Sequence, residues 1–341
     1  MRVLSYPILI CDIVNLTSIK GVLFMEDTES KRIRQALRVA RYYFESNYDQ
    51  SRIAKEMGLS RPTVSRLLQF ARDNGYVQIK IVDPFDDAST MEAELAEKYS
   101  LNKVIVTYSP SSDYQTIIKA LGKSSADYLE SIVKDGDSIG VTWGHTMSEL
   151  AKNLSPKNNN QENVKVVQLK GGVTHSETNN FAREIISEFA DAFHTTAESL
   201  PLPVIFDNAE TSKLVLQDKH TQYIMNEGRK TNIAVYTVGT VRDDAMLFNL
   251  GYLNDKEVKT LKRDAVGDIS SRFINSDGKI ANQAINQRTI GIALDDLKDK
   301  EYSILIAGGE QKTNSIKAAL KGGYPNVLIT DETTARSLLE N

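Results

Sequence analysis

The sequence predicts an α/β protein built from a small N-terminal winged helix-turn-helix domain and a larger domain with a mostly parallel sheet. Three observations predict this division. A helix-turn-helix pattern covers residues 50–68, a short acidic segment follows at 83–90, and apolar strands then alternate with amphipathic helices to the C-terminus. A chain of 341 residues, of which 41% are hydrophobic, is long enough for two or three globular domains.

Residues 50–68 have the pattern of two short helices joined by a turn that contains glycine. Ala54 falls where the helices cross, and only a small side chain lets them approach. Gly58 falls in the turn, where a positive φ angle favours glycine. Ser60 is a good N-cap, and Pro62 suits the first helical turn because its missing amide proton is not needed there. A helical hairpin with a merely solvated polar face is the alternative.

The second helix of the pair is expected to present a polar face to DNA. The residues that would reach bases and phosphates in the major groove are Ser60, Arg61, Thr63, Ser65, Arg66 and Gln69. Residues 31–82 carry 11 Lys or Arg against 4 Asp or Glu, whereas the whole chain has a net charge of −4. A basic N-terminal segment followed by an acidic remainder indicates a nucleic-acid-binding module joined to a domain with another ligand.

The first 24 residues fit neither domain. Asp12 and Asn15 interrupt an apolar run that is too short to span a membrane, and no signal-peptide cleavage site follows. We therefore expect Met25 to be the physiological start, with a short membrane-binding or partner-binding tail as the alternative. The single cysteine, Cys11, excludes an internal disulfide and fits a cytoplasmic protein.

The DNA-binding domain is expected to cover residues 25–82. Apolar residues at helical spacing predict a helix over 31–46 beneath the reading pair, and the alternation in 76–82 predicts the β-strand of a wing. A linker is expected at 83–90, which is acidic, contains a proline and lacks periodicity. The second domain would then cover 91–341.

In this second domain, alternating strands and helices predict a mostly parallel sheet covered on both faces. Strands are expected at 103–108, 138–142, 164–169, 233–238, 302–307 and 326–330. Ligands of such sheets bind beyond the carboxyl ends of the strands. Loops with glycine follow four of the strands, at 142–147, 170–176, 238–244 and 307–312. Because glycine lets backbone amides approach an anion, we expect these loops to hold a phosphorylated ligand.

The residues assigned to this ligand site are Gly144, His145, Thr146, Lys170, Gly171, Gly172, Gly239, Thr240, Arg242, Asp268 and Lys312. Lys170 ends an apolar strand directly before two glycines. Desolvation there would lower the pKa of its amine, and a neutral amine can condense with an aldehyde. Pairing with phosphate, or simple solvation, is the commoner role of a lysine. Arg242 and Lys312 are expected to pair with a phosphate or carboxylate. Asp268 would accept sugar hydroxyls or form a structural ion pair with Arg272.

No spacing of His, Cys, Asp and Glu predicts a metal site, and we expect no cofactor. His145 and His175 lie in two of the glycine loops, whereas His194 and His220 are expected in helices. An enzyme that isomerises or deaminates a sugar phosphate is the alternative to a sensor. Asp268 and His145 would be its acid and base.

The chain resembles the SorC family of bacterial transcriptional regulators. The matching runs are SRPTVSRLLQFARDNGYVQIKIVDPF, VKDGDSIGVTWGHTM, VVQLKGGVTHS, LPLPVIFDNA, NIAVYTVGTVRD, AVGDISSRF and AINQRTIG. They cover essentially everything from Ser30 to the C-terminus, whereas residues 1–24 have no counterpart in the family. The resemblance implies an effector domain related to sugar-phosphate isomerases and deaminases that has become a sensor, within a homodimer or homotetramer.

The same resemblance implies a repressor that binds operator DNA and is released by a phosphorylated sugar. In the deoxyribonucleoside branch of the family the effector is deoxyribose 5-phosphate, and the lysine of the QLKGG run bonds its aldehyde carbon. That lysine matches Lys170. The phosphate loop of the family matches Gly144, His145 and Thr146, and its AGGxxK run matches Lys312. Another phosphorylated sugar or polyol is the alternative effector.

Overall fold

The computed structural model describes residues 29–77, 87–156, 159 and 161–340. The chain divides into two compact units, 1–84 and 85–341. The expected N-terminal tail and most of the expected wing strand lie outside the described residues. Within the expected linker 83–90, residues 88–90 already belong to a helix. Among the helices that the structure describes, none combines the length and the apolar character that a membrane span requires.

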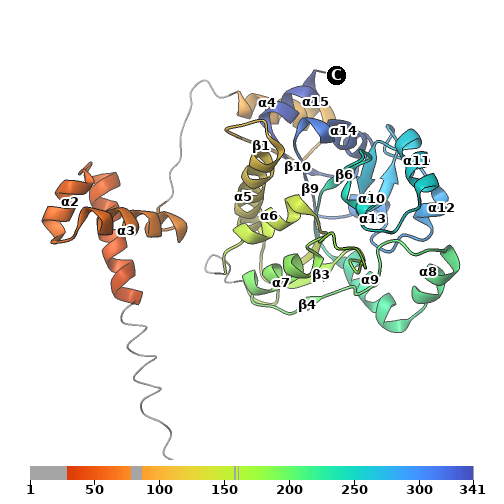
Figure 1. Ribbon diagram of the computed structural model, residues 1–341, viewed down its shortest axis with the longest axis horizontal. Helices are drawn as coiled ribbons and strands as arrows, with labels where there is room; N and C mark the ends of the chain where they lie inside the picture. The colour runs from red at the N-terminus through yellow and green to blue at the C-terminus, as the bar shows by residue number, and fades with distance from the viewer. Residues whose placement is uncertain (1–28, 78–86, 157–158, 160, 341) are drawn as a thin grey trace, which may run out of the picture. The chain divides into compact units, whose positions relative to one another are not determined.

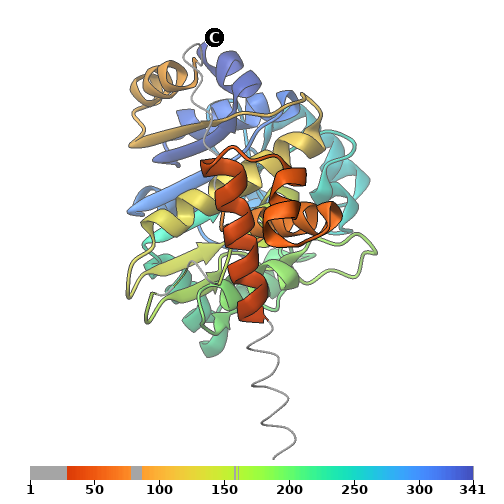
Figure 2. The ribbon, with the colours of Figure 1, turned by 90° about the vertical axis from the view of Figure 1, so that its left-hand side faces the viewer.

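The N-terminal unit is helical in its described part. Residues 29–40 form an α-helix that continues as a π-helical turn, η1 (Arg41–Glu45), and α2 (Gln50–Met57) and α3 (Arg61–Asp73) follow. The three segments pack around one apolar cluster, in which Val39, Ile53 and Val64 are fully buried. Figure 2 shows the first helix, in red, lying against the α2–α3 pair. The predicted helix-turn-helix is therefore present.

Local sequence explains the geometry of this pair. Gly58 follows α2 with a φ of 62°, the left-handed conformation that favours glycine. Ser60 precedes α3, and its side chain accepts a hydrogen bond from the Thr63 amide at 3.3 Å. Ala54 is buried between the helices, as its small size predicts.

The larger unit contains a seven-stranded, wholly parallel sheet in the order β1-β10-β9-β5-β2-β3-β4. The strands are β1 (Lys103–Thr107), β2 (Ser138–Val141), β3 (Lys165–Gln168), β4 (Ala197–Glu198), β5 (Ile233–Tyr236), β9 (Tyr302–Ile306) and β10 (Val327–Asp331). All six expected strands are present, and the predicted parallel α/β class is confirmed. The two-residue β4 was not predicted, because it is too short to show a pattern.

A second, antiparallel sheet was also not predicted. It joins β6 (Val238–Thr240), β7 (Gly267–Ile269) and β8 (Arg272–Ile274). The expected strand 233–238 is in fact two elements, β5 in the large sheet and the start of β6 in the small one. Strands of three residues leave no periodicity to detect.

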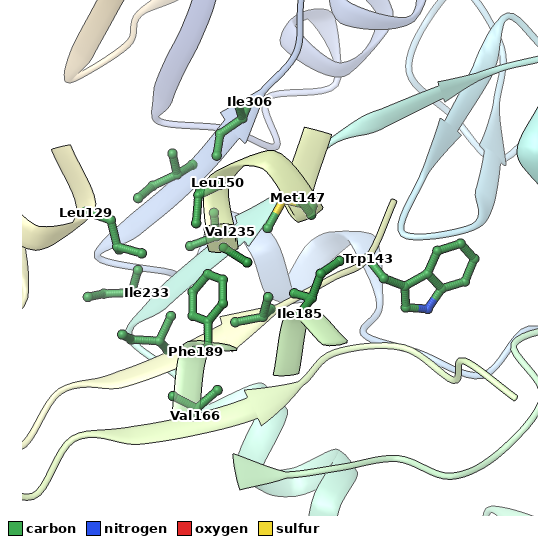
Figure 3. Packing of buried hydrophobic residues seen from close by; sticks show 14 of the residues in the cluster. Leu129, Trp143, Met147, Leu150, Val166, Ile185, Phe189, Ile233, Val235 and Ile306 are labelled. Atoms are coloured by element: carbon green, nitrogen blue, oxygen red, sulfur yellow. The ribbon is translucent and has the colours of Figure 1, made fainter. Parts of the chain in front are cut away.

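Helices cover both faces of the large sheet (Figure 1). The helices of the larger unit are α4 (Ala88–Tyr99), α5 (Tyr114–Ile132), α6 (His145–Asn153), α7 (Ala182–Ala192), α8 (Ala209–Val215), α9 (Lys219–Lys230), α10 (Met246–Asn249), α11 (Asp255–Asp264), α12 (Gln283–Asn286), α13 (Leu294–Lys298), the 3-10 turn η2 (Glu310–Lys312), α14 (Thr313–Lys321) and α15 (Glu332–Leu339). Figure 3 shows the cluster between the sheet and α5, α6 and α7, where Phe189 packs with Val166 and Ile233. This rigid body fixes the strand ends from which the site is built.

Candidate functional site

A pocket of about 470 Å³ lies beyond the carboxyl ends of β2, β3, β5 and β9. Loops that are far apart in sequence meet there because parallel strands end at the same edge of the sheet. Of the residues assigned to a ligand from the sequence, those that line this pocket are Gly144, His145, Thr146, Lys170, Gly239, Thr240, Arg242, Asp268 and Lys312. The structure thus brings most of the expected site together.

Lys170 is enclosed at the base of this pocket, with 5% of its surface exposed. Its Nζ atom donates a hydrogen bond to Ser271 Oγ at 3.2 Å and lies 3.5 Å from the centre of the Trp143 ring. Burial lowers the pKa of Lys170 to about 8, against the opposing effect of the Asp268 charge. Roughly one tenth of the molecules therefore carry a neutral amine at pH 7.

Trp143 is a wall residue that the sequence analysis did not assign. Its indole Nε1 donates a hydrogen bond to Gly171 O at 2.8 Å, which fixes the ring against the Lys170 amine. A cation is attracted to the face of an indole ring. The ring therefore holds the amine in place. The signal available in the sequence was that Trp143 is the single tryptophan of the chain and lies in the glycine loop 142–147, directly before Gly144.

Asp268, on β7, is a buried carboxylate of which only 5% of the surface is exposed. Its charge acts on the pKa of Lys170. Its Oδ2 accepts a hydrogen bond from the Ser271 amide at 2.9 Å. Burial raises the pKa of Asp268, although the positive charge of Lys170 opposes this shift. The neighbouring Gly239 makes room for the carboxylate, because a Cβ atom there would lie 1.9 Å from Asp268 Oδ1.

The hairpin between β7 and β8 positions this carboxylate. Its two turn residues, Ser270 and Ser271, have φ angles of 51° and 68°. Two successive positive φ angles are typical of a type I′ hairpin turn, which is costly for residues other than glycine and asparagine. The strained turn directs Ser271 toward both Asp268 and Lys170.

The expected ion pair between Asp268 and Arg272 is wrong. The Arg272 guanidinium instead donates hydrogen bonds to Ile292 O at 2.8 Å, Gly291 O at 2.7 Å and Asn286 Oδ1 at 2.6 Å. Asp268 and Arg272 lie on adjacent strands of a hairpin, where Arg272 pairs with Ile269. Successive side chains of a strand alternate between faces, so Arg272 points to the opposite face of the small sheet from Asp268. Arg272 ties the small sheet to the segment after α12.

The N-terminus of α6 forms a second part of the pocket wall. Gly144 occupies the N-cap with a φ of 131°, and no side chain in the described part of the chain caps this helix end. Thr146, 1% exposed, has an Oγ1 atom without a hydrogen-bond partner among the described residues. Uncapped amides and the helix dipole favour an anion at such an end. A phosphate group would supply acceptors for the amides and for the Thr146 hydroxyl.

Lys312 adds a buried positive charge. It is 7% exposed, donates a hydrogen bond to Thr237 Oγ1 at 3.3 Å and lies 5.6 Å from the Tyr114 ring centre. Its charge also contributes to lowering the pKa of Lys170. Desolvation, followed by the Lys312 charge, lowers the pKa of His145, so this imidazole is neutral at pH 7. The pocket is therefore electropositive apart from the Asp268 carboxylate and Asp244 at its rim.

Thr240 and Arg242 line the outer part of the pocket. Arg242 Nε lies 3.4 Å from Asp244 Oδ1, and both side chains are exposed. An exposed ion pair contributes little free energy, so Arg242 can exchange this partner for a ligand anion.

Gly171 and Gly172 do not line this pocket. Their amides donate hydrogen bonds to Ile290 O at 3.1 Å and to Leu202 O at 2.9 Å. A Cβ atom on Gly171 would lie 2.6 Å from Leu202 O. These glycines therefore permit close packing of two backbone segments, and their amides are already used within the protein.

The last part of the loop between β3 and α7, residues 177–181, closes one side of the pocket. The sequence analysis did not assign this part. Its Thr178, Asn179 and Phe181 line the wall, and the Phe181 ring lies 5.2 Å from the His145 ring. The loop is held by Thr174 Oγ1, which donates to Leu250 O at 2.9 Å. A polar loop without periodicity gives no sequence signal for such a role.

The polar face of α3 forms the candidate DNA surface. Arg61, Ser65, Arg66 and Gln69 are exposed, and Thr63 is partly exposed. Ser60 caps the helix, and its hydroxyl also lies 2.8 Å from the Thr63 hydroxyl. Gln69 donates a hydrogen bond to Asp73 at 2.6 Å. Arg61 and Arg66 have exposed side chains. Like Ser60 and Gln69, Arg66 has a partner within the protein, because its Nε donates a hydrogen bond to Pro62 O at 3.4 Å.

Within the described residues, no group of three or more His, Cys, Asp and Glu side chains is arranged to hold a metal ion. The histidines are dispersed. His220 lies in α9, as expected, whereas His194 follows the end of α7 with a φ of 51° and lies in a turn, not in a helix.

Residues 83–340 match the Sugar-bind family, which describes a sugar-binding domain. The chain is 49% identical over 315 residues to the deoxyribonucleoside regulator of Bacillus subtilis, a match that covers 92% of this chain and 99% of that protein. It belongs to the SorC family of sugar-binding transcriptional regulators. The sorbitol operon regulator of Klebsiella pneumoniae is 29% identical over 93% of this chain and 100% of its own length.

The SorC fold extends over both units. The crystal structure of full-length SorC from Klebsiella pneumoniae matches with a TM-score of 0.74 at 28% identity and covers 90% of this chain and 98% of that chain. These matches confirm the resemblance drawn from the sequence. The matched relatives are named as regulators, which favours a regulator over the alternative of an isomerase or deaminase.

Proposed function

We propose that this SorC-family protein is a repressor of deoxyribonucleoside catabolism that 2-deoxyribose 5-phosphate releases from operator DNA. The observation that carries the proposal is the buried amine of Lys170, whose pKa of about 8 leaves a reactive fraction at neutral pH. The 49% identity to the deoxyribonucleoside regulator of Bacillus subtilis supports the class of regulated genes.

In this proposal the two ends of the sugar phosphate contact two neighbouring strand ends. The loop after β2 leads into α6, whose uncapped N-terminus would receive the phosphate. Lys170 follows the adjacent strand β3 and would meet the aldehyde of the open-chain sugar. The neutral amine adds to the aldehyde carbon, and the carbonyl oxygen leaves as water, so that a C=N bond joins ligand and protein.

Release of DNA requires that the effector binds one conformation of the regulator more tightly than another. A coupling free energy of about 1–3 kcal/mol is typical of such linkage. A single helix-turn-helix reads few bases, so we expect a homodimer or homotetramer with two α3 helices on a symmetric operator. The exposed arginines of α3 would supply the contacts.

The covalent step is tested by borohydride trapping. The full chain is incubated with 2-deoxyribose 5-phosphate, reduced and digested, and peptide masses locate the adduct. We expect the adduct on Lys170 in the wild type and in Lys165→Ala, and its loss in Lys170→Ala. Lys165 is an exposed lysine on β3, the strand that precedes Lys170. Lys170→Ala should still bind operator DNA but no longer respond to the sugar phosphate.

Two outcomes would contradict the proposal. An adduct on another lysine, or none, would remove the Schiff base. In that case a thermal-shift series of sugar and polyol phosphates identifies the effector, because a ligand of the folded state raises the melting temperature. Loss of operator binding in Lys170→Ala would give Lys170 a structural role instead.

A further inference from the structure

The Lys170 amine needs a partner that handles protons. At neutral pH the larger fraction is ammonium, which has no lone pair to attack an aldehyde. After attack, the hydroxyl of the carbinolamine leaves as water only if it receives a proton. Both steps are hindered in a buried pocket, where bulk water does not reach the amine freely. A nearby acid–base group is therefore required for rapid condensation.

Asp268 is placed for this task. The Ser271 residue connects it to Lys170: the Ser271 amide donates to Asp268 Oδ2 at 2.9 Å, and the Ser271 hydroxyl accepts from Lys170 Nζ at 3.2 Å. The carboxylate and the amine are both buried, and each affects the pKa of the other. Asp268 Oδ1 occupies the space that a side chain at Gly239 would take, and both residues line the pocket.

The other titratable and charged groups of the pocket do not fit this role. They are Tyr114, His145, Arg242, Asp244 and Lys312. Lys312 and Arg242 are cationic, and the Tyr114 ring packs near the Lys312 amine, with 5.6 Å between that amine and the ring centre. Asp244 is exposed and pairs with Arg242 at the rim. His145 lies at the start of α6, where the phosphate is proposed to bind, and its ring packs against Phe181.

We propose that Asp268 is the proton-transfer group for Schiff-base formation at Lys170. Acting through a water molecule in the pocket, its carboxylate takes one proton from the ammonium, and the freed amine forms the C–N bond. The resulting carboxylic acid returns the proton to the carbinolamine hydroxyl, and the C–O bond breaks to release water. The product is an iminium ion beside the Asp268 carboxylate, so the net charge of the pair is the same before and after. This inference rests on the proposed function.

An electrostatic role alone predicts the opposite sign for Asp268→Asn. The Asp268 charge raises the pKa of Lys170, so its removal would increase the neutral fraction of the amine and speed the attack. Loss of a proton-transfer group should instead slow adduct formation by about a hundredfold or more. Asparagine has nearly the shape of aspartate, so it fits beside Gly239 and can still accept the Ser271 hydrogen bond.

The experiment measures the rate of the borohydride-trapped adduct on Lys170 as a function of 2-deoxyribose 5-phosphate concentration, in the full chain. The variants are Asp268→Asn and Asp277→Asn, an exposed carboxylate paired with Lys321 and outside the pocket lining. Binding of 2-deoxyribitol 5-phosphate, which has no aldehyde, reports the integrity of the pocket. We expect Asp268→Asn to lower the maximal rate about a hundredfold, with binding of the polyol phosphate changed only a few-fold, and Asp277→Asn to match the wild type.

A second measurement uses Asp268→Ala, in which formate can occupy the vacated space. Formate should raise the maximal rate of this variant and leave the wild type unchanged. An Asp268→Asn variant whose maximal rate equals or exceeds that of the wild type overturns the inference but leaves the proposed function intact. The same holds if only the half-saturating concentration rises, because Asp268 would then merely bind the sugar. A wild type that forms no adduct overturns the proposed function, and this inference with it.

Discussion

The two units of this protein place their charges in opposite surroundings. In the N-terminal unit, Arg61 and Arg66 lie exposed on α3, whereas in the larger unit Lys170, Lys312 and Asp268 are buried around one pocket. Exposed charges are screened by salt and interact weakly in pairs, but buried charges interact strongly. The comparison teaches that the proposed DNA surface consists of exposed side chains, whereas the proposed effector site depends on a few buried side chains held in fixed positions.

The buried side of the comparison predicts the largest effect, in the pH dependence of stability. The pKa of Lys170 falls from an ordinary 10.5 to about 8 in the folded state. Below pH 8 Lys170 is protonated in both the folded and the unfolded protein, and the folded protein bears the full free-energy cost of a buried ammonium. This cost disappears as pH rises to about 10.5, so Lys170 adds roughly 3 kcal/mol of stability across that window.

Urea unfolding followed by the fluorescence of Trp143, the single tryptophan, measures this effect in the larger unit. The difference in unfolding free energy between the wild type and Lys170→Met should rise between pH 8 and 10.5, while the tyrosines and other lysines cancel. Parallel curves for the two proteins would mean that Lys170 titrates like a solvated lysine, and the contrast between the two units would be lost.

The exposed side predicts a smaller effect that is confined to DNA. Arg66→Ala should weaken operator binding by about 1–3 kcal/mol and reduce its salt dependence. It should not change adduct formation, which takes place in the other unit. Gel-shift titrations at several salt concentrations measure this, with Arg263→Ala, an exposed arginine at the end of α11, as control. Equal loss of affinity in both variants would indicate a general charge effect without a specific surface.

A substitution at Gly239 tests the packing around the buried Asp268 carboxylate in the larger unit. A Cβ atom there would lie 1.9 Å from Asp268 Oδ1, so the carboxylate must move. We expect Gly239→Ala to destabilise the larger unit by about 1–3 kcal/mol and to slow adduct formation. Gly228→Ala is the control, since its nearest neighbour, Leu169, is at 3.4 Å and alanine favours a helix interior. Chemical denaturation and the rate of adduct trapping on Lys170 distinguish the variants. An unchanged trapping rate in Gly239→Ala would show that this glycine does not act through Asp268.

The smallest effect is optical. The Lys170 amine lies 3.5 Å from the Trp143 ring centre, so conversion of the ammonium to an iminium should change the intensity of tryptophan emission. The change should appear on addition of 2-deoxyribose 5-phosphate to the wild type and to Lys165→Ala. It should be missing in Lys170→Ala. An equal response in Lys170→Ala would assign it to phosphate binding at α6.

The contrast between the units also explains what the sequence could predict. In the helix-turn-helix, Gly58 acts through its own φ angle and Ser60 through the nearby Thr63 amide. Local sequence rules are therefore enough to predict both roles. In the larger unit, the position of Lys170 followed from a strand end and a topological rule. Its partners did not, because Ser271 and Trp143 reach it through contacts between segments far apart in the chain.

The errors have the same origin. Gly171 and Gly172 have the composition of an anion-binding loop, yet their amides already donate hydrogen bonds to Ile290 O and Leu202 O. Arg272 stands four residues from Asp268, yet it donates to carbonyls after α12. Composition and spacing identify which groups are available, whereas long-range packing decides which partners they use.

The most direct test of the central claim measures release of operator DNA by the full chain. The account predicts that 2-deoxyribose 5-phosphate dissociates the wild-type complex at concentrations where 2-deoxyribitol 5-phosphate does not, and that Lys170→Ala stays bound with either compound. Equal release by the aldehyde and by the polyol would contradict the account, because the bond to Lys170 would then contribute nothing to the response.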